Sequence, residues 1–227
     1  MNLLERMPEE SNRNYIYRTL RANIMHLSLI PGAHISETEL SAIFNLSRTP
    51  IREALILLEK EKLIEILPKK KSRVSLIHLD LVHSAVFLRK AVEKEIIHEA
   101  CERIDSDTLL WLKNNLEFQK NMILNGENHS SFYQLDNLFH AKIYNSVQKE
   151  SVWSTLENMS THYNRLRHLD ASENISLSTI VVQHDRLIQI IENKDHESVE
   201  TFVDTHLKNV FHRLDEVRAK FGSYMTD

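Results

Sequence analysis

Glycine is scarce in this chain, and that scarcity limits what the chain can fold into. Only Gly32, Gly126 and Gly222 occur among 227 residues, whereas 42% of the residues are hydrophobic. A β-rich fold needs many tight turns and a phosphate-cradling loop needs closely spaced glycines, so both are disfavoured. The apolar residues suffice for the core of one large or two small domains. The sequence therefore predicts a mainly α-helical protein.

Cysteine content and charge distribution bear on location and partners. Cys101 is the only cysteine, so the chain has no internal disulfide and no thiolate metal cluster, as expected of a cytoplasmic protein. No long apolar run or signal-like N-terminus indicates a membrane or export. The net charge is −4, but residues 15–76 carry an excess of four positive charges and residues 77–227 an excess of seven negative ones. This division favours a DNA-binding head on a body with another role.

The segment from residue 15 to residue 62 is predicted to form three helices. The first helix begins at Tyr15, has an apolar stripe of Ile16, Leu20, Ile24 and Leu27, and is stopped by Ser28-Leu29-Ile30-Pro31-Gly32. Ser36, with Glu39 three positions later, forms a capping box that opens a second, short helix. Asn45-Leu46 then makes a turn into the third. Two short helices joined by a tight turn are typical of a helix-turn-helix.

The third helix contains the most informative run of the chain, SRTPIREAL, from Ser47 to Leu55. Ser47 or Thr49 is expected to cap its first turn. Ile51, Leu55 and Leu58 repeat at helical spacing and mark a buried stripe. Arg48 and Arg52 are four positions apart and lie off that stripe, with the Thr49 hydroxyl beside them. Two guanidinium groups and a hydroxyl at the start of a helix suit phosphate and guanine contacts in a DNA major groove.

Two β-like segments, residues 63–67 and 73–76, follow this helix and flank a cationic turn. Lys69, Lys70, Lys71 and Arg73 place four cations in five residues, which suits backbone phosphates or the minor groove. A lysine run by itself is usually a solvated loop. Its position directly after a helix-turn-helix favours a DNA-contacting wing.

Residues 15–76 resemble the winged helix-turn-helix domain of the GntR family of bacterial transcriptional regulators. The nine-residue run in the third helix is a specific signature of that family and not a generic helix. The matching residues are Ile24, Leu29, Pro31-Gly32, Leu40, the run Ser47–Leu55, Leu63, Pro68 and Val74.

This resemblance implies roles for individual residues. Arg48 and Thr49 would meet phosphates, and Arg52 would read a guanine. Two positions depart from the family pattern. Lys71 stands where the family usually has a glycine at the wing tip, and Thr38 stands where some relatives have an arginine. Both departures concern the detail of the DNA contact.

The rest of the chain is predicted to be an antiparallel helical bundle, because apolar residues recur at helical spacing and short connections join the segments. The expected helices span residues 79–103, 107–124, 131–147, 150–168, 176–193 and 196–221. The expected organisation is a flexible arm at 1–14, a DNA-binding domain at 15–77, a helical effector-binding and dimerisation domain at 78–222 and a tail at 223–227.

One carboxylate and three imidazoles are expected to point into this bundle. Asp136 and His140 lie four apart along one apolar stripe, and His184 and His206 lie on the stripes of two later helices. A buried aspartate is unfavourable unless it is paired or coordinated. Together the four suit a divalent transition metal, with zinc the first candidate and nickel, manganese or iron as alternatives. The competing interpretation is a set of core histidines bonded to their neighbours.

The same four residues resemble the metal-binding set of the FCD effector domain, which is the C-terminal half of the FadR-type branch of GntR regulators. Leu88-Arg89-x-x-x-Glu93 and Asn145-Ser146 also fit that domain. The resemblance implies that the body binds a small carboxylate beside or on the metal and forms a homodimer. Arg89, and after it Arg165, are the cations nominated for the effector carboxylate.

The sequence thus predicts a DNA-binding regulator, with two heads reading a two-fold symmetric operator and an organic-acid effector acting through the metal site. Two alternatives stay open. His184-Asp185 is the dipeptide that names a class of helical metal phosphohydrolases, although the two side chains point about 100° apart on a helix. The other is an interaction protein whose bundle dimerises and whose inward histidines hold no metal.

Overall fold

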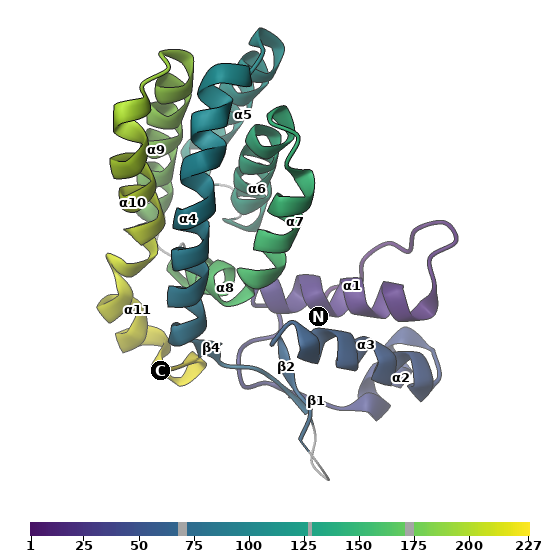
Figure 1. The fold of residues 1–227 in the computed structure, drawn as a ribbon. Helices are drawn as coiled ribbons and strands as arrows, with labels where there is room; N and C mark the ends of the chain where they lie inside the picture. The colour runs from purple at the N-terminus through teal and green to yellow at the C-terminus, as the bar shows by residue number, and fades with distance from the viewer. Residues whose placement is uncertain (68–71, 127–128, 171–174) are drawn as a thin grey trace. The chain divides into compact units, whose positions relative to one another are not determined.

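A computed structural model of the chain describes residues 1–67, 72–126, 129–170 and 175–227. The fold is mainly α-helical, as predicted (Figure 1). The chain divides into two compact units, one made of Met1–Leu81 and Arg218–Asp227 and the other of Val82–Val217. Within the described ranges, no helix is both long enough and apolar enough to cross a membrane.

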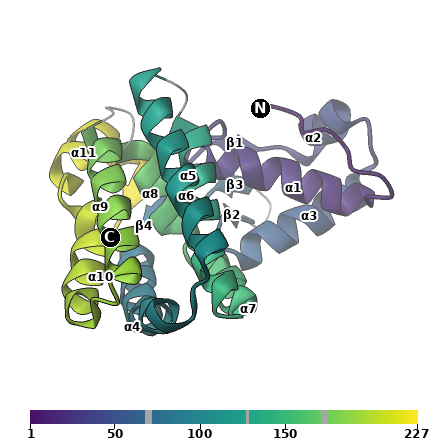
Figure 2. The same cartoon turned by 90° about the horizontal axis from the view of Figure 1, so that it is seen from above.

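Three helices form most of the N-terminal unit: α1 (Asn12–Met25), α2 (Glu37–Phe44) and α3 (Arg48–Lys60). Both α1 and α2 pack against α3. Figure 2 shows α1 and α3 side by side. The shared core is built from side chains with almost no exposed surface, and includes Ile16, Leu20, Ile24, Ile51, Leu55 and Leu58. These are residues of the predicted apolar stripes, so hydrophobic periodicity located this core correctly. Leu27 is the exception, because α1 ends at Met25 and Leu27 is only half-buried.

The two helix starts differ in how they are capped. Ser36 precedes α2, and its side chain accepts a hydrogen bond from the Glu39 backbone N–H at 3.4 Å, as the capping box predicts. Asn45 ends α2 in the left-handed conformation and starts the turn. Ser47 is the N-cap residue of α3, but within the described chain its hydroxyl accepts no capping bond. The expected cap of α3 by this side chain is therefore wrong.

The predicted hairpin is present as part of a three-stranded antiparallel sheet. Strand β2 (Ile64–Glu65) pairs with β3 (Ser72–Val74), and β3 pairs on its other side with β1 (His34–Ile35). The register places Glu65 opposite Arg73. Sequence reading missed β1, because two residues are too few to show an alternating pattern. Lys69, Lys70 and Lys71 lie outside the described residues.

The two ends of the chain are both bonded to other segments of this unit. The Asn23 side chain donates to the Asn2 carbonyl at 2.8 Å and accepts from the Asn2 N–H at 2.7 Å. At the other end, β5 (Met225–Thr226) pairs in parallel with β4 (Ile77–His78). Residues that the sequence suggested as an arm and a tail therefore take part in specific contacts.

The second unit is a helical bundle in which α5 packs against α6 and α9, and α9 packs against α10. Its helices run α4 (Leu79–Arg103), α5 (Ser106–Leu124), α6 (His129–Ser146), α7 (Glu150–Met159), α8 (Thr161–Asp170), α9 (Ile175–Glu192), α10 (Val199–Lys208) and α11 (Leu214–Phe221). α4 begins in the N-terminal unit, and α11 ends in it.

Two predicted helices are broken in the structure. The segment predicted at 150–168 divides at Ser160 into α7 and α8, and the segment predicted at 196–221 divides into the 3₁₀ turn η2 (His196–Ser198), α10, a second turn η3 (Asn209–Phe211) and α11. Apolar periodicity does not reveal a change of helix axis, because each piece keeps its own buried stripe.

Replacing Leu58 by alanine tests the α1–α3 core. This side chain is fully buried, so Leu58→Ala should lower the free energy of unfolding by about 2–5 kcal/mol. The matched control is Ile56→Ala on the same helix, where the side chain is 47% exposed and the loss should be about 0.5 kcal/mol or less. Urea unfolding measures both variants, and equal losses would contradict the assignment of the buried face.

Candidate metal centre and DNA-reading helix

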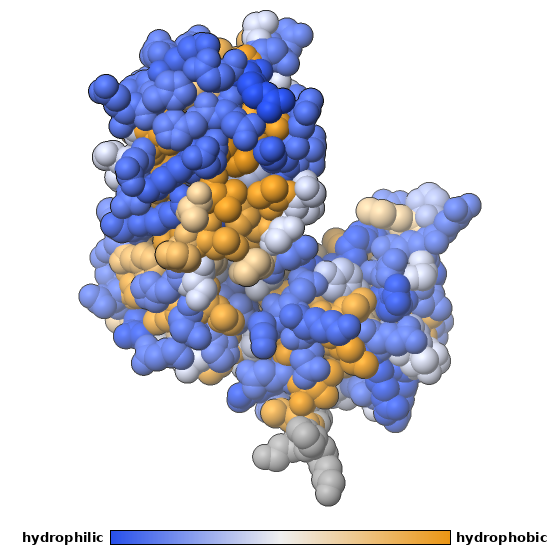
Figure 3. Space-filling view, in the orientation of Figure 1, coloured by the Kyte–Doolittle hydropathy of each residue, from blue (hydrophilic) through white to orange (hydrophobic). Residues whose placement is uncertain are grey.

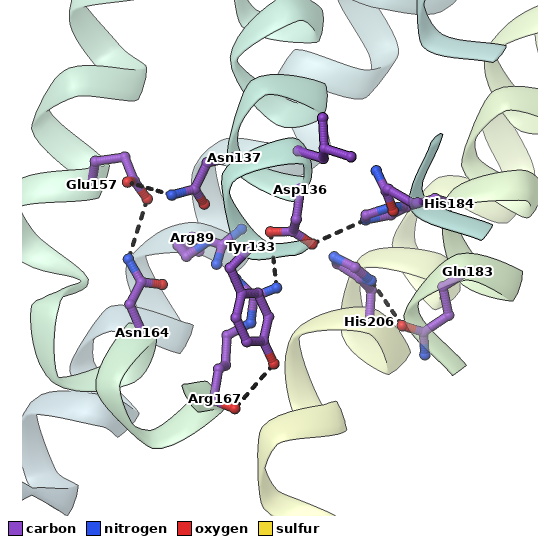
Figure 4. Close-up of polar contacts among 12 residues, drawn as sticks. Arg89, Tyr133, Asp136, Asn137, Glu157, Asn164, Arg167, Gln183, His184 and His206 are labelled. Atoms are coloured by element: carbon purple, nitrogen blue, oxygen red, sulfur yellow. Dashed lines mark hydrogen bonds and ion pairs between the residues drawn. The ribbon is translucent and has the colours of Figure 1, made fainter. Parts of the chain in front are cut away.

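Four inward polar residues predicted from the sequence come from three helices of the bundle. Asp136 and His140 lie on α6, His184 on α9 and His206 on α10, and none is more than 6% exposed. One ring nitrogen of each of the three histidines lies within 4.8 Å of the others. The chain therefore brings three imidazoles together in a buried space, with the carboxylate beside them. Figure 4 shows Asp136 with two of these histidines, His184 and His206.

Two glutamine side chains determine which ring nitrogen of His184 and of His206 is free to bind a metal. Nδ1 of His184 lies 2.9 Å from Oε1 of Gln119, and Nδ1 of His206 lies 2.9 Å from Oε1 of Gln183. An amide oxygen only accepts, so each Nδ1 carries the proton and each Nε2 keeps its lone pair. Nε2 of His140 and of His184 has no hydrogen-bond partner in the described chain. Such outer contacts typically orient metal-binding histidines.

Gln119 belongs to a longer buried chain of amides. Its NH₂ group donates to Oδ1 of Asn115 at 2.7 Å, and Asn115 donates to the Leu135 carbonyl at 3.3 Å. Sequence reading missed Gln119. It lies on α5, and no spacing in the sequence links it to a histidine on α9.

The three imidazoles are neutral at pH 7. Burial is the main cause, and it lowers the pKa of His184 to about 4 and the pKa values of His140 and His206 well below their ordinary range. Metal ligands have to be deprotonated. A divalent ion would therefore meet three ready nitrogen donors here and would displace no proton from them.

Asp136 has two different neighbours. Oδ1 lies 3.5 Å from Nε2 of His184, close to the separation of about 3.4 Å between two ligands of a tetrahedral zinc ion. Oδ2 forms an ion pair with Nη2 of Arg167 at 2.9 Å. Burial acts to raise the pKa of Asp136, but Arg167 and, less strongly, His184 outweigh it, so the pKa is lower than usual and the carboxylate is charged. Three nitrogens and one oxygen could hold a divalent metal.

Arg167 is a feature of this site that the sequence did not single out. Its guanidinium lies over the rings of Tyr133, at 4.5 Å from the centroid, and Tyr163, at 5.6 Å. The Tyr133 hydroxyl donates to the Arg167 carbonyl at 3.0 Å (Figure 4). Nearly every described residue of α8 is buried, so this short helix has no polar face that would separate a functional arginine from a solvated one.

The two arginines nominated for the effector both have protein neighbours. Arg89, which is 4% exposed, donates to Glu93 at 2.5 Å. Arg165 is fully buried, its Nη2 lies 3.0 Å from Nδ1 of His162, and burial lowers its pKa to about 9. Their role as effector contacts stays a prediction.

In the N-terminal unit, α3 exposes the side chains expected to meet DNA. Ser47, Arg48 and Thr49 are all exposed at its start. The Arg52 side chain is 62% exposed, and its Nε donates to Glu37 of α2 at 2.8 Å. Arg52 would have to exchange this surface ion pair, which is typically worth less than about 1 kcal/mol, for a base contact.

Arg73 is the one predicted wing cation whose placement the structure describes. It lies on β3 and pairs with Glu65 on β2 at 2.7 Å. Lys69, Lys70 and Lys71 are outside the described ranges, so their predicted contacts stay predictions.

The histidine–aspartate pair of the phosphohydrolase alternative does not form a site. His184 points into the imidazole cluster, whereas Oδ2 of Asp185 accepts a hydrogen bond from Gln189 on the same helix at 2.7 Å. The helical repeat turns adjacent side chains about 100° apart, so Asp185 is directed away from the other metal-binding candidates.

Comparison with protein families gives two matches along the chain. Residues 12–74 match the family described as "Bacterial regulatory proteins, gntR family", and residues 85–209 match the FCD domain. The second match contains all four residues of the candidate metal centre, and the first contains the SRTPIREAL run.

Individual proteins agree with these matches. An uncharacterized HTH-type transcriptional regulator in an unstable DNA locus of Streptomyces ambofaciens is 36% identical over 209 residues, which cover 92% of this chain and 87% of that protein. The HTH-type transcriptional repressor RspR of Escherichia coli (strain K12) is 28% identical over 220 residues, covering 97% and 96%. The solved structure of E. coli McbR/YncC has the same fold, with a TM-score of 0.74, 18% identity and coverage of 93% and 99%. This chain therefore belongs to the GntR family of bacterial regulatory proteins, and it is a DNA-binding transcriptional regulator with an FCD domain, not an enzyme.

Proposed function

We propose that this regulator is a cytoplasmic homodimer whose affinity for its operator is set by a small carboxylate effector, bound at a divalent metal in the helical unit. The observation that carries the proposal is the convergence of three buried, neutral imidazoles beside the charged carboxylate of Asp136. Polar groups of this kind are rarely left in a core without a partner.

His140, His184, His206 and Asp136 would hold the metal, and Gln119 and Gln183 would keep two of the rings in the binding tautomer. Zinc is the first candidate, and nickel, manganese or iron accept the same donors. The bound ion would supply a Lewis acid that fixes a carboxylate of the effector. Arg89 and Arg165 are the arginines that the sequence nominates as further contacts.

Two copies of the N-terminal unit would read a two-fold symmetric operator. Arg48 and Thr49, with the hydroxyl of Ser47, would meet phosphates at the start of α3, and Arg52 would pair with a guanine. Arg73 and the three wing lysines, Lys69, Lys70 and Lys71, would contact the backbone or the minor groove. The effector would alter operator affinity through a coupling free energy of roughly 1–3 kcal/mol.

Exposed apolar side chains support the proposal of a homodimer. Apolar surface gathers over the lower half of α4 in Figure 3. Large exposed apolar residues of the helical unit include Phe87 on α4, which is 76% exposed, and Leu110 and Phe118 on α5, at 58% and 63%. Apolar surface of this kind often marks a protein contact, and a second copy of the chain would cover it.

Replacing Arg52 by alanine tests the assignment of the base-reading residue. Arg52→Ala removes a bidentate guanine contact, so discrimination between the operator and a scrambled duplex should fall by about 1–3 kcal/mol. Gel shifts with the DNA upstream of the chain's own gene, and with a scrambled version of it, measure this difference. Unchanged discrimination would assign base reading to another residue.

The matched control for DNA binding is Lys70→Ala, because the sequence predicts that this wing lysine contacts the backbone and not a base. Its loss should weaken binding to both duplexes alike and reduce the slope of log affinity against log salt by about 1. Loss of sequence discrimination in this variant would contradict the division of roles.

The metal site is tested by His184→Ala. Protein purified without a histidine tag should contain about one zinc per chain, because one tetrahedral ion uses all four donors, whereas the variant should contain much less. Chelation should lower the melting temperature of the wild type, because it removes a ligand that binds only the folded state, and should change the variant little. The exposed His212→Ala serves as control. Wild-type protein with sub-stoichiometric metal would favour an interaction module with metal-free core histidines.

A further inference from the structure

Two ion pairs between buried side chains lie beside the imidazole cluster. Glu93 pairs with Arg89 at 2.5 Å, and Asp136 pairs with Arg167 at 2.9 Å. All four side chains are at most 10% exposed. Because the imidazoles are neutral, these two ion pairs and the three histidines together carry no net charge.

A divalent metal would upset that balance. It would add two positive charges to a set of neutral nitrogens, and an uncompensated charge in a core costs several kcal/mol. The Asp136 carboxylate carries a single negative charge, so it cannot neutralise both the metal and Arg167. Glu93 is engaged with Arg89. Loading the site therefore leaves Arg167 as a buried cation that lacks a counter-charge.

The surroundings of Arg167 allow it to take a counter-charge from outside. Only one of its nitrogens has a hydrogen-bonding or ionic neighbour within the described ranges, namely Oδ2 of Asp136. The side chain is 10% exposed and lines a small crevice together with Tyr133, His206 and Asn209. The buried Asp170 carboxylate also lines this crevice, and it has its own counter-ion in Arg213, at 3.5 Å. A guanidinium has five N–H donors in a fixed fork that suits a carboxylate. The crevice touches both the cation and one imidazole of the candidate metal centre.

We propose that Arg167 is the anion-binding residue of this regulator, and that metal on Asp136 is what makes it available to an incoming carboxylate. The inference rests on the proposed function. It adds that Arg167 binds the anion and that bound metal raises the affinity for the anion. Metal and anion bind cooperatively, since the anion offsets one of the two positive charges that the metal adds. By linkage, the factor by which the metal raises anion affinity equals the factor by which the anion raises metal affinity.

Arg89 and Arg165, which the sequence nominates as effector contacts, fit the role of anion-binding residue less well than Arg167. Arg89 keeps Glu93 as its counter-ion whether or not a metal is present. Arg165 lies against His162, and it is absent from the crevice that contains His206. Arg167 is the one arginine that contacts a candidate metal ligand among the described residues.

The coupling is measured with two probes, zinc alone and trifluoroacetate. Calorimetry follows zinc uptake by the full-length chain, and fluorine NMR follows the anion, each titrated with and without the other. In the wild type, zinc should raise anion affinity at least fivefold, within the roughly 5–150-fold range of typical couplings, and the anion should raise zinc affinity by the same factor.

Arg167→Met then identifies the residue. The zinc-loaded variant should still bind zinc but should lose anion affinity at least fivefold. The matched control is the double variant Lys113→Met with Glu192→Gln, which removes a 2.7 Å ion pair of the same helical unit without changing net charge. Its zinc-loaded anion affinity should stay within twofold of the wild type. If the control loses as much as Arg167→Met, the assignment to Arg167 is overturned.

Asp136→Asn provides a second variant in case Arg167→Met fails to fold. It removes the counter-charge of Arg167 without any metal, so the metal-free variant should bind trifluoroacetate at least fivefold more tightly than the metal-free wild type. Equal affinities would overturn the inference. A wild type that takes up no zinc would refute the proposed metal function, whereas zinc uptake with unchanged anion binding in Arg167→Met would refute only the role of Arg167.

Discussion

The carboxylate of Asp136 has no exposed surface, and the interior of the helical unit is arranged around its charge. An unpaired charge at this depth would cost several kcal/mol. Arg167 provides the counter-charge from α8, and His184 faces the other oxygen from α9. One side chain of α6 thus ties together two helices that follow it in the chain. Removing one partner of such a pair typically costs about 3–5 kcal/mol.

Amide side chains complete this polar interior. Gln119 and Gln183 accept from the imidazoles and so leave the Nε2 atoms of His184 and His206 without a proton. Asn115 holds Gln119 and is itself held by a backbone carbonyl of α6. The arrangement sets tautomer and ring direction before any ligand arrives, which reduces the cost of ordering the site on binding.

Much of the site could be predicted from helical spacing, because Asp136, His140, His184 and His206 interrupt apolar stripes that have to face a core. The same reasoning could not find Arg167, since the short helix α8 is buried almost all round and its apolar and polar residues show no separate faces. It also missed the break at Ser160 and the pairing of β5 with β4, which joins residues far apart in the chain.

The sequence by itself determined the helical class, the DNA-reading helix and the four inward polar residues. Each depends on local information: glycine content, a nine-residue signature, and side chains spaced at the helical repeat. Tertiary structure decided which counter-charge each buried carboxylate receives. Arg89 pairs within its own helix, four residues from Glu93, whereas Arg167 reaches Asp136 across thirty-one positions of sequence. Pairings of the second kind depend on how the helices pack, because ion pairs form between groups that are near in space, whatever their separation along the chain.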